Sequence, residues 1–87
     1  MVESYLEYKH NLGFQLIGEA YFLRAFARYT EEINYTGPLT REIVFRWCES
    51  GDNPSLTTKG RRFEPLKGLA DYVVSFDQDS EPLPKLP

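Results

Sequence analysis

Four basic side chains crowd into one short stretch of this acidic chain. They occur in "KGRRFEPLK", residues 59–67, where Glu64 is the one acidic residue. Lysine and arginine at such density are the side chains that neutralise phosphate groups and donate hydrogen bonds to them. The stretch therefore indicates a surface for a polyanion, and an ordinary solvated helix face is the alternative that the residues leave open. The basic residues are Lys59, Arg61, Arg62 and Lys67.

The net charge of the 87 residues, −3, conceals this local excess of positive charge. Residues 1–55 carry five basic and eight acidic side chains, and residues 71–87 carry one basic and four acidic side chains. Residues 56–70 alone are positive, with four basic side chains against one acidic. Because binding responds to the local field, an acidic chain can still bind a polyanion at such a place.

Side chains that could perform catalysis or hold a metal are few and are not grouped. His10 and Cys48 are each the single residue of their type, so the ligand spacing of a zinc site is absent. Glu31 and Glu32 are adjacent, which is typical of a solvated helix face. The chain has neither a G-x-x-x-x-G-K-S/T phosphate loop nor a G-x-G-x-x-G dinucleotide motif. We therefore expect no enzymatic activity from this chain alone, and no cofactor, metal or small-molecule substrate.

Length and composition favour one small folded domain. The chain is 41% hydrophobic and 15% aromatic, which is enough apolar surface to order 87 residues. Cys48 has no partner for an internal disulfide, so it is predicted to be a small buried apolar residue in a reducing compartment. Residues 1–10 lack the pattern of a signal peptide, and no run of 18 apolar residues occurs. These features predict a cytoplasmic protein without membrane contact.

The first half of the sequence predicts two helices. "VESYLEYKHNLG", residues 2–13, places Val2, Tyr5 and Leu6 on one face, and Gly13 is a natural stop. The second helix runs over about residues 18–34, where apolar residues recur at the spacing of one helix face. "NYTGP", residues 34–38, has the composition of a turn that ends it. The predicted apolar stripe of the second helix is Phe22, Ala25, Phe26, Tyr29 and Ile33.

The second half predicts two more helices. Thr40 is a good N-cap for a helix that ends at Gly51, with an apolar face of Ile43, Val44, Trp47 and Cys48. Thr57 or Thr58 is predicted to cap a fourth helix. Pro65 lies inside it and predicts a kink or a new start there, because proline removes one backbone donor and clashes with the preceding turn. The apolar residues of this helix are Phe63, Leu66, Leu69, Ala70, Val73 and Phe76.

The last nine residues, "DSEPLPKLP", have the composition of an extended linker outside the core. The predicted fold is therefore all-α, with a domain over residues 1–78 and a Pro-rich linker over residues 79–87. No strand is expected. The side chains predicted to be largely buried are Phe22, Phe26, Tyr29, Trp47, Leu66, Leu69 and Val73.

The order of the segments resembles the N-terminal core-binding domain of tyrosine recombinases, the phage-integrase family. "YLEYKHNLGFQ" is followed by "YFLRAFARYTEEI", then "GPLTREIVFRWCES", then "TTKGRRFEPLKGLADYVVSFD" and a Pro-rich exit. The family has a Y-L-x-x-K opening, a helix ending F-x-x-Y, and a G-x-L-T-x-E-x-V-x-x-W helix. A basic fourth helix and a prolyl linker follow. The likeness covers nearly the whole chain and rests on order and spacing, since each piece is degenerate.

This resemblance implies a four-helix, SAM-like orthogonal bundle that grips one face of double-stranded DNA at a recombination half-site. It implies other recombinase protomers as partners, a bacterial or phage-derived source, and a separate catalytic domain whose residues have no counterpart here. Pro65 and the negative total charge depart from the family pattern. Carried over by position, the DNA-binding residues are Arg24 and Arg28 on the second helix and Thr57, Thr58, Lys59, Arg61, Arg62 and Lys67 on the fourth.

Two interpretations of function thus remain open on the sequence. One is a DNA-binding domain of a site-specific recombinase, which the resemblance favours. The other is a helical protein-interaction domain without DNA-binding activity, in which the basic stretch is only the solvated start of a helix. A free-standing enzyme has little support in these residues.

Overall fold

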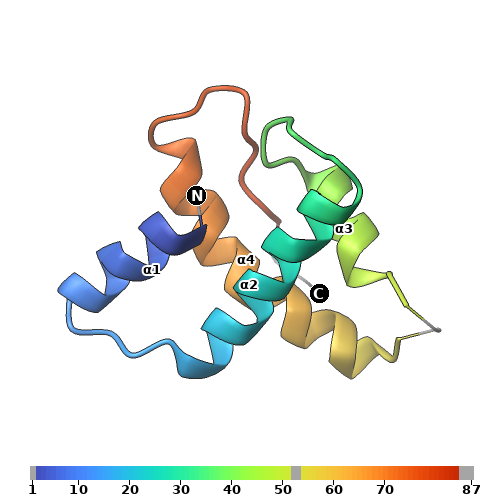
Figure 1. Ribbon diagram of the computed structural model, residues 1–87, viewed down its shortest axis with the longest axis horizontal. Helices are drawn as coiled ribbons and strands as arrows, with labels where there is room; N and C mark the ends of the chain where they lie inside the picture. The colour runs from blue at the N-terminus through green and yellow to red at the C-terminus, as the bar shows by residue number, and fades with distance from the viewer. Residues whose placement is uncertain (1, 52–53, 85–87) are drawn as a thin grey trace. The chain divides into compact units, whose positions relative to one another are not determined.

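Four α-helices make up the secondary structure of the part that the computed structural model describes, residues 2–51 and 54–84 (Figure 1). They are α1 (Val2–Asn11), α2 (Ile17–Glu32), α3 (Arg41–Cys48) and α4 (Leu56–Val74). These residues contain no strand, so the predicted all-α class is confirmed. None of the helices in this part is long and apolar enough to cross a membrane. The chain divides into two units, Met1–Thr36 and Gly37–Pro87.

The first unit is a pair of helices joined by residues 12–16. α1 and α2 contact each other and run in roughly opposite directions (Figure 1). Gly13 ends α1 as predicted: its φ is 91°, a left-handed value that glycine adopts at little cost, and its amide donates to the carbonyl of His10 at 2.9 Å. α2 ends just before Asn34, which also has a positive φ of 57°.

The buried face of α2 differs from the predicted stripe. Phe26 is buried as predicted, but the second fully buried side chain is Leu23, which the stripe omits. Ile33 is 41% exposed, and Phe22 and Tyr29 are half-buried, so these three predictions of burial are wrong or only partly right. Apolar residues occur on several sides of this helix, so spacing alone does not identify the buried face.

The second unit pairs α3 with α4. Thr40 caps α3 as predicted, because its hydroxyl accepts a hydrogen bond from the amide of Ile43 at 3.4 Å. The four apolar residues predicted for its inner face are all buried: Ile43, Val44, Trp47 and Cys48. α4 buries Phe63, Leu66, Leu69, Ala70 and Val73, whereas Phe76, predicted on the same face, lies beyond the end of the helix and is 66% exposed.

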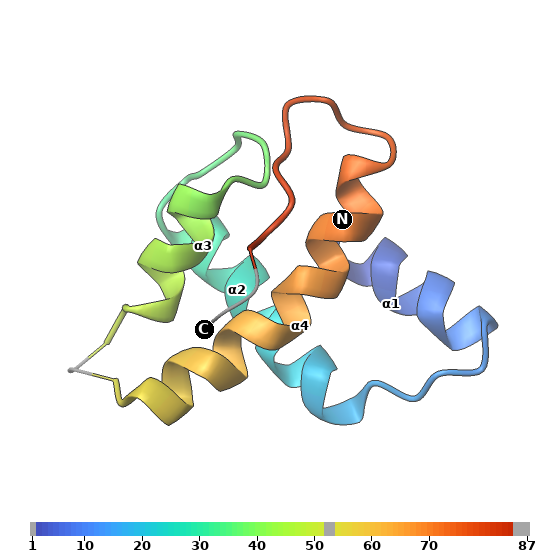
Figure 2. The ribbon, with the colours of Figure 1, turned by 180° about the vertical axis from the view of Figure 1, so that it is seen from behind.

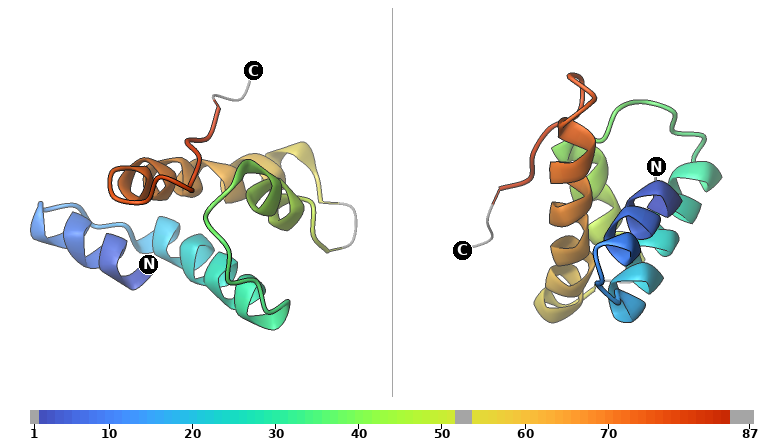
Figure 3. Two further views of the ribbon diagram at one scale, coloured as in Figure 1. Left: turned by 90° about the horizontal axis from the view of Figure 1, so that it is seen from above. Right: turned by 90° about the vertical axis from the view of Figure 1, so that its left-hand side faces the viewer.

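α4 is one continuous helix that contains Pro65 (Figure 3). The predicted new start near Pro65 is therefore wrong, although the axis changes direction along the helix in Figure 2. Pro65 cannot donate to the carbonyl of Arg61, so one helical hydrogen bond is missing there. Large buried side chains on both sides of the proline, Phe63 and Leu66, hold the helix together across this gap.

The segment after α4 folds back onto the start of α3. The sequence predicted instead that residues from 79 onward form a linker outside the core. The hydroxyl of Ser80, a residue only 7% exposed, accepts from the amide of Leu39 at 3.1 Å and donates to Asp77 at 2.8 Å. Glu81 accepts from the amide of Arg41 at 2.9 Å. Figure 1 shows this red segment beside the green segment that precedes α3. Residues 85–87 of the predicted linker lie outside the described residues.

Trp47 supplies the first testable prediction, because it is a large ring that is only 5% exposed. Trp47→Ala should lower the free energy of unfolding by about 3–5 kcal/mol, the usual effect of deleting a buried aromatic side chain. Urea denaturation followed by circular dichroism measures this change. Phe76→Ala is the matched control, since Phe76 is 66% exposed and its loss should change stability little. Equal effects of the two substitutions would contradict the described core.

Candidate nucleic-acid interface

The start of α4 is capped by Ser55, and not by Thr57 or Thr58 as predicted. The Ser55 hydroxyl accepts from the amide of Thr58 at 3.2 Å and donates to the Thr58 hydroxyl at 3.1 Å. Both polar groups of Thr58 thus take part in the cap, as in a short Ser/Thr turn at a helix start. Thr57 lies in the first turn and is exposed. Of the two predicted threonines, Thr57 is thus exposed, and Thr58 is half-buried.

The basic residues of α4 point to different sides of the helix. Successive residues are about 100° apart around an α-helix, so Lys59 and Arg61 lie on nearly opposite faces. Arg61 is exposed on the same side as Thr57. Lys59 is half-buried and lines a cavity between α3 and α4, and Lys67 lies 3.9 Å from Glu64 in an ion pair. Residues that cluster in the sequence therefore do not form one basic patch on α4.

Arg62 has a structural contact that the sequence did not reveal. Its Nη1 atom donates to three backbone carbonyls at the C-terminal end of α3: Trp47 at 3.2 Å, Cys48 at 3.1 Å and Ser50 at 2.8 Å. Its guanidinium carbon lies 5.7 Å from the centre of the Trp47 ring. The last carbonyls of a helix lack helical partners and carry partial negative charge, so a cation is favoured there. Arg62 thus caps α3 from α4.

Arg24 on α2 is held by Glu3 on α1 in a two-point ion pair. Its Nε and Nη2 atoms donate to the two carboxylate oxygens at 3.0 and 3.2 Å. The hydrogen bonds lower the pKa of the Glu3 carboxyl and raise the pKa of Arg24. The two side chains are 59% and 70% exposed, so solvent and salt weaken the pair and a phosphate can compete with it. The two residues are 21 positions apart in the sequence, so no local pattern indicates this contact.

Arg28 lies one turn further along α2 and is exposed. It lines a shallow depression of about 360 Å³ together with Arg24, Glu3 and Glu31. Two guanidinium groups and two carboxylates therefore share this place, and their charges balance. Arg24 and Arg28 do lie on one face of α2 as predicted, but in a locally neutral environment.

Cys48 is buried at the C-terminal end of α3, which agrees with its predicted role as a small core residue. Burial raises the pKa of its thiol to about 11, because the thiolate would lose its hydration, and Arg62 nearby opposes this rise. The thiol is therefore protonated at neutral pH and is poorly suited to act as a nucleophile.

Comparison with known proteins adds the evidence on relatedness. A protein of Sinorhizobium fredii (strain NBRC 101917 / NGR234), named "Putative integrase/recombinase y4rE", is 29% identical to this chain over 82 residues. The alignment covers 94% of this chain and 26% of that protein, so the chain spans about a quarter of the relative's length. No family model matches the chain, and no solved structure matches it. The similarity indicates a relationship to the integrases over nearly the whole chain.

The cap by Arg62 predicts a strong asymmetry between two adjacent arginines. Arg62→Met should lower the free energy of unfolding by about 1–3 kcal/mol, because hydrogen bonds from a charged group to buried carbonyls are lost. Arg61→Met makes the same replacement on the exposed side of α4, so it should leave the free energy of unfolding nearly unchanged. Thermal and urea unfolding of both variants compares them directly. Similar stability of the two variants would show that the contact with α3 contributes little.

The raised pKa of Cys48 predicts a loss of stability at high pH. In the unfolded chain the thiol loses its proton near the ordinary value of 9.0, whereas in the folded chain it keeps it until about 11. Between these two pH values the folded state binds one proton more than the unfolded state. The free energy of unfolding therefore falls as the pH rises from 9 towards 11. Urea midpoints at several pH values under reducing conditions measure the loss. In Cys48→Ala the decline over this range should be shallower; an identical decline would contradict the assignment.

Proposed function

We propose that this chain is the core-binding domain of a tyrosine recombinase and binds double-stranded DNA at a recombination half-site. The observation that carries the proposal is the similarity to the Sinorhizobium protein over 94% of the chain. The order of the motifs and the four helices agree with it. Integration or another rearrangement of DNA would then be the task of the longer protein to which such a domain belongs.

We assign contacts with the DNA backbone to those predicted site residues whose side chains are exposed. Arg61 and Thr57 share the outward side of the first turns of α4 and are the first candidates for phosphate contacts. Lys59 lies nearly opposite that side and Lys67 pairs with Glu64, so neither is assigned a phosphate contact. Arg62 is not proposed as a phosphate contact, because its guanidinium already binds carbonyls at the end of α3. Phosphate contacts of this kind fix the position of a protein on the duplex without reading its sequence.

Arg24 and Arg28 on α2 form the second candidate contact. Glu3 must release Arg24, or share it, before a phosphate can bind, and Glu31 opposes the approach of DNA nearby. We therefore expect weak binding by the isolated domain, in the range of roughly 10⁻⁴ to 10⁻⁶ M that is usual for non-specific complexes at physiological salt. With Arg24, Arg28 and Arg61 as contacts, the slope of log K against log salt should be roughly −2 to −3.

Catalysis is not assigned to this chain. Strand cleavage in the proposed family belongs to a second domain, and the relative is nearly four times as long as the matched part. A boundary near residue 79, followed by a linker, is part of this proposal. The contacts of Ser80 and Glu81 with Leu39 and Arg41 would then fix the direction in which such a linker leaves the domain.

A protein-interaction domain without DNA binding is the second candidate. Large apolar side chains with high exposure favour it: Ile17 and Tyr21, one turn apart on α2, are 81% and 71% exposed. Monomeric soluble proteins rarely expose many such side chains close together, and groups of them mark interaction surfaces. The two candidates differ in one simple respect, which is whether the domain binds duplex DNA at low salt.

Titration of the domain with a labelled DNA duplex at low salt tests the proposal. Arg61→Glu should weaken binding at least about ten-fold and make the salt slope shallower by about one, because one phosphate contact is lost and a repulsion is added. Arg46→Glu is the matched control: it makes the same change of charge on α3, where Arg46 pairs with Glu42. Equal binding by the Arg61 variant, the Arg46 variant and the unmodified chain would support the protein-interaction candidate instead.

A further inference from the structure

The cavity between α3 and α4 is an apolar hollow of the second unit that the proposed DNA contacts do not use. Its volume is about 500 Å³, within the range of roughly 300–1,000 Å³ that is usual for small-molecule sites. The rings of Phe45 and Phe63 line it and are stacked with their centres 5.5 Å apart, and Cys48 adds to the apolar lining. The charged side chains of the lining are Lys59 and Glu49.

Lys59 brings a positive charge to this cavity without a carboxylate partner among the described residues. Its side chain is half-buried, whereas the cations that form ion pairs in this part of the chain are Arg24, Arg46 and Lys67. An ammonium group that has lost part of its hydration is stabilised by a nearby anion. Glu49 is exposed, so water and salt screen its charge. The Lys59 ammonium is therefore available to an anion bound in the cavity.

Gly60 leaves one wall of the cavity open down to the backbone of α4. A glycine inside a helix is destabilising relative to alanine. A Cβ built on Gly60 would have no other described atom within 4 Å outside the backbone of its own helix turns, and its φ is not left-handed. Neither packing nor backbone geometry within the described residues therefore requires a glycine here. A molecule that fills the cavity and lies against the helix backbone would require it.

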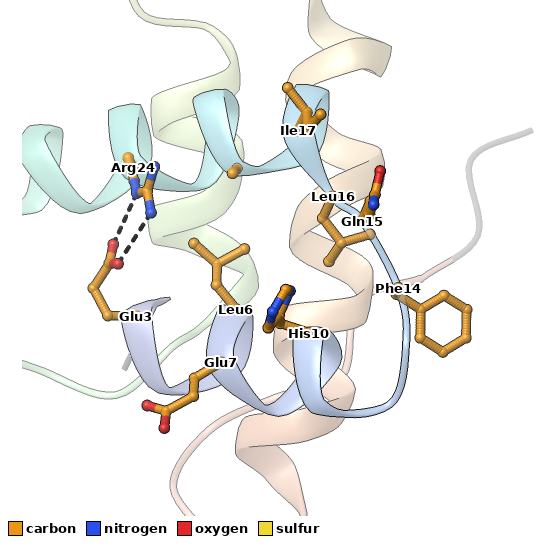
Figure 4. A pocket seen from close by; sticks show the side chains of 10 residues that line it. Glu3, Leu6, Glu7, His10, Phe14, Gln15, Leu16, Ile17 and Arg24 are labelled. Carbon is orange, nitrogen blue, oxygen red and sulfur yellow. Dashed lines mark hydrogen bonds and ion pairs between the residues drawn. The ribbon is translucent and has the colours of Figure 1, made fainter.

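The groove between α1 and α2, a hollow of about 700 Å³ in the first unit, lacks this combination (Figure 4). Its guanidinium group belongs to Arg24, and the dashed lines in Figure 4 mark the two hydrogen bonds that join it to the carboxylate of Glu3. Glu7 lines the groove as well, so carboxylates outnumber the guanidinium group. An apolar anion is therefore favoured in the cavity between α3 and α4 and disfavoured in the groove.

We propose that the cavity between α3 and α4 binds a small molecule in which an aliphatic or aromatic body carries one carboxylate. The apolar body lies beside Phe45 and Phe63 and against the backbone at Gly60, and the carboxylate accepts a hydrogen bond from the Lys59 ammonium. Burial of apolar surface supplies the affinity, and the ion pair fixes the orientation. Arg61 lies nearly opposite Lys59 on α4, so this site is separate from the proposed phosphate contacts and needs no DNA.

Titration of the isotope-labelled chain with hydrocinnamate and with octanoate, up to about 10 mM and followed by NMR, tests the site. Both acids should shift the backbone signals of residues 45–49 and 56–63. Their uncharged amides should bind at least about ten-fold more weakly, because a hydrogen bond between two charged groups is lost. Lys59→Met should weaken binding of the acids by the same factor and leave binding of the amides unchanged. Lys67→Met is the matched control on α4, outside the cavity, and should bind like the unmodified chain.

A second variant blocks the cavity without removing a charge. Gly60→Leu should abolish binding of both acids and keep the helices, because leucine favours a helix more than glycine does. Gly18→Leu makes the same replacement in α2, where a Cβ also has open space, and should bind like the unmodified chain. Circular dichroism checks that every variant keeps its helices.

Three results would overturn the inference: no shift at the highest concentration, equal binding of acids and amides, or equal binding by the Lys59 and Lys67 variants. A Lys59→Met chain that binds the acids normally but duplex DNA weakly would assign this lysine to the DNA surface and would overturn the inference too. Because the titration with acids contains no DNA, its outcome is independent of the titration that tests the proposed function.

Discussion

The second unit depends on one charged side chain that is placed where a short helix ends. α3 has only eight residues, so half of its carbonyls lie in its last turn and lack partners within the helix. Arg62 supplies donors to the carbonyls of Trp47, Cys48 and Ser50 and lies against the Trp47 ring. It thereby joins the end of α3 to the second turn of α4. The cavity between α3 and α4, and the outward direction of Arg61, follow from this connection.

The same connection explains why a basic stretch in the sequence divides into separate roles. Successive residues of an α-helix are about 100° apart, so cations at positions 59, 61, 62 and 67 lie on different sides of α4. Arg62 points inward to α3, Lys67 lies beside Glu64, and Lys59 lines the cavity between α3 and α4. Arg61 alone is exposed on the outward side. The effective positive charge of α4 towards a polyanion is therefore smaller than its sequence suggests, and binding by a single domain should be correspondingly weak.

Local features of the fold could be predicted from the sequence, and contacts between distant residues could not. Thr40, Gly13 and the apolar face of α3 behave as predicted because each acts within a few residues of itself. Leu23 was missed because aromatic residues occur on several sides of α2, and Ser55 was missed because two threonines, Thr57 and Thr58, follow it within three positions. The cap by Arg62, the pair of Arg24 with Glu3, and the hydrogen bond between Leu39 and Ser80 join residues 12 to 41 positions apart. These long-range contacts determine which predicted site residues are exposed, and no local sequence pattern predicts them.

Weak contacts of this kind become effective when several act together. In the proposed function the outward side of α4 contributes one or two phosphate contacts, and α2 contributes two more in a neutral environment. Joining such a domain to further DNA-binding elements, or to a neighbouring copy on the same duplex, turns later contacts into intramolecular ones with a high effective concentration. An acidic domain with few free cations is then an advantage, since it binds firmly only where its partners are also bound.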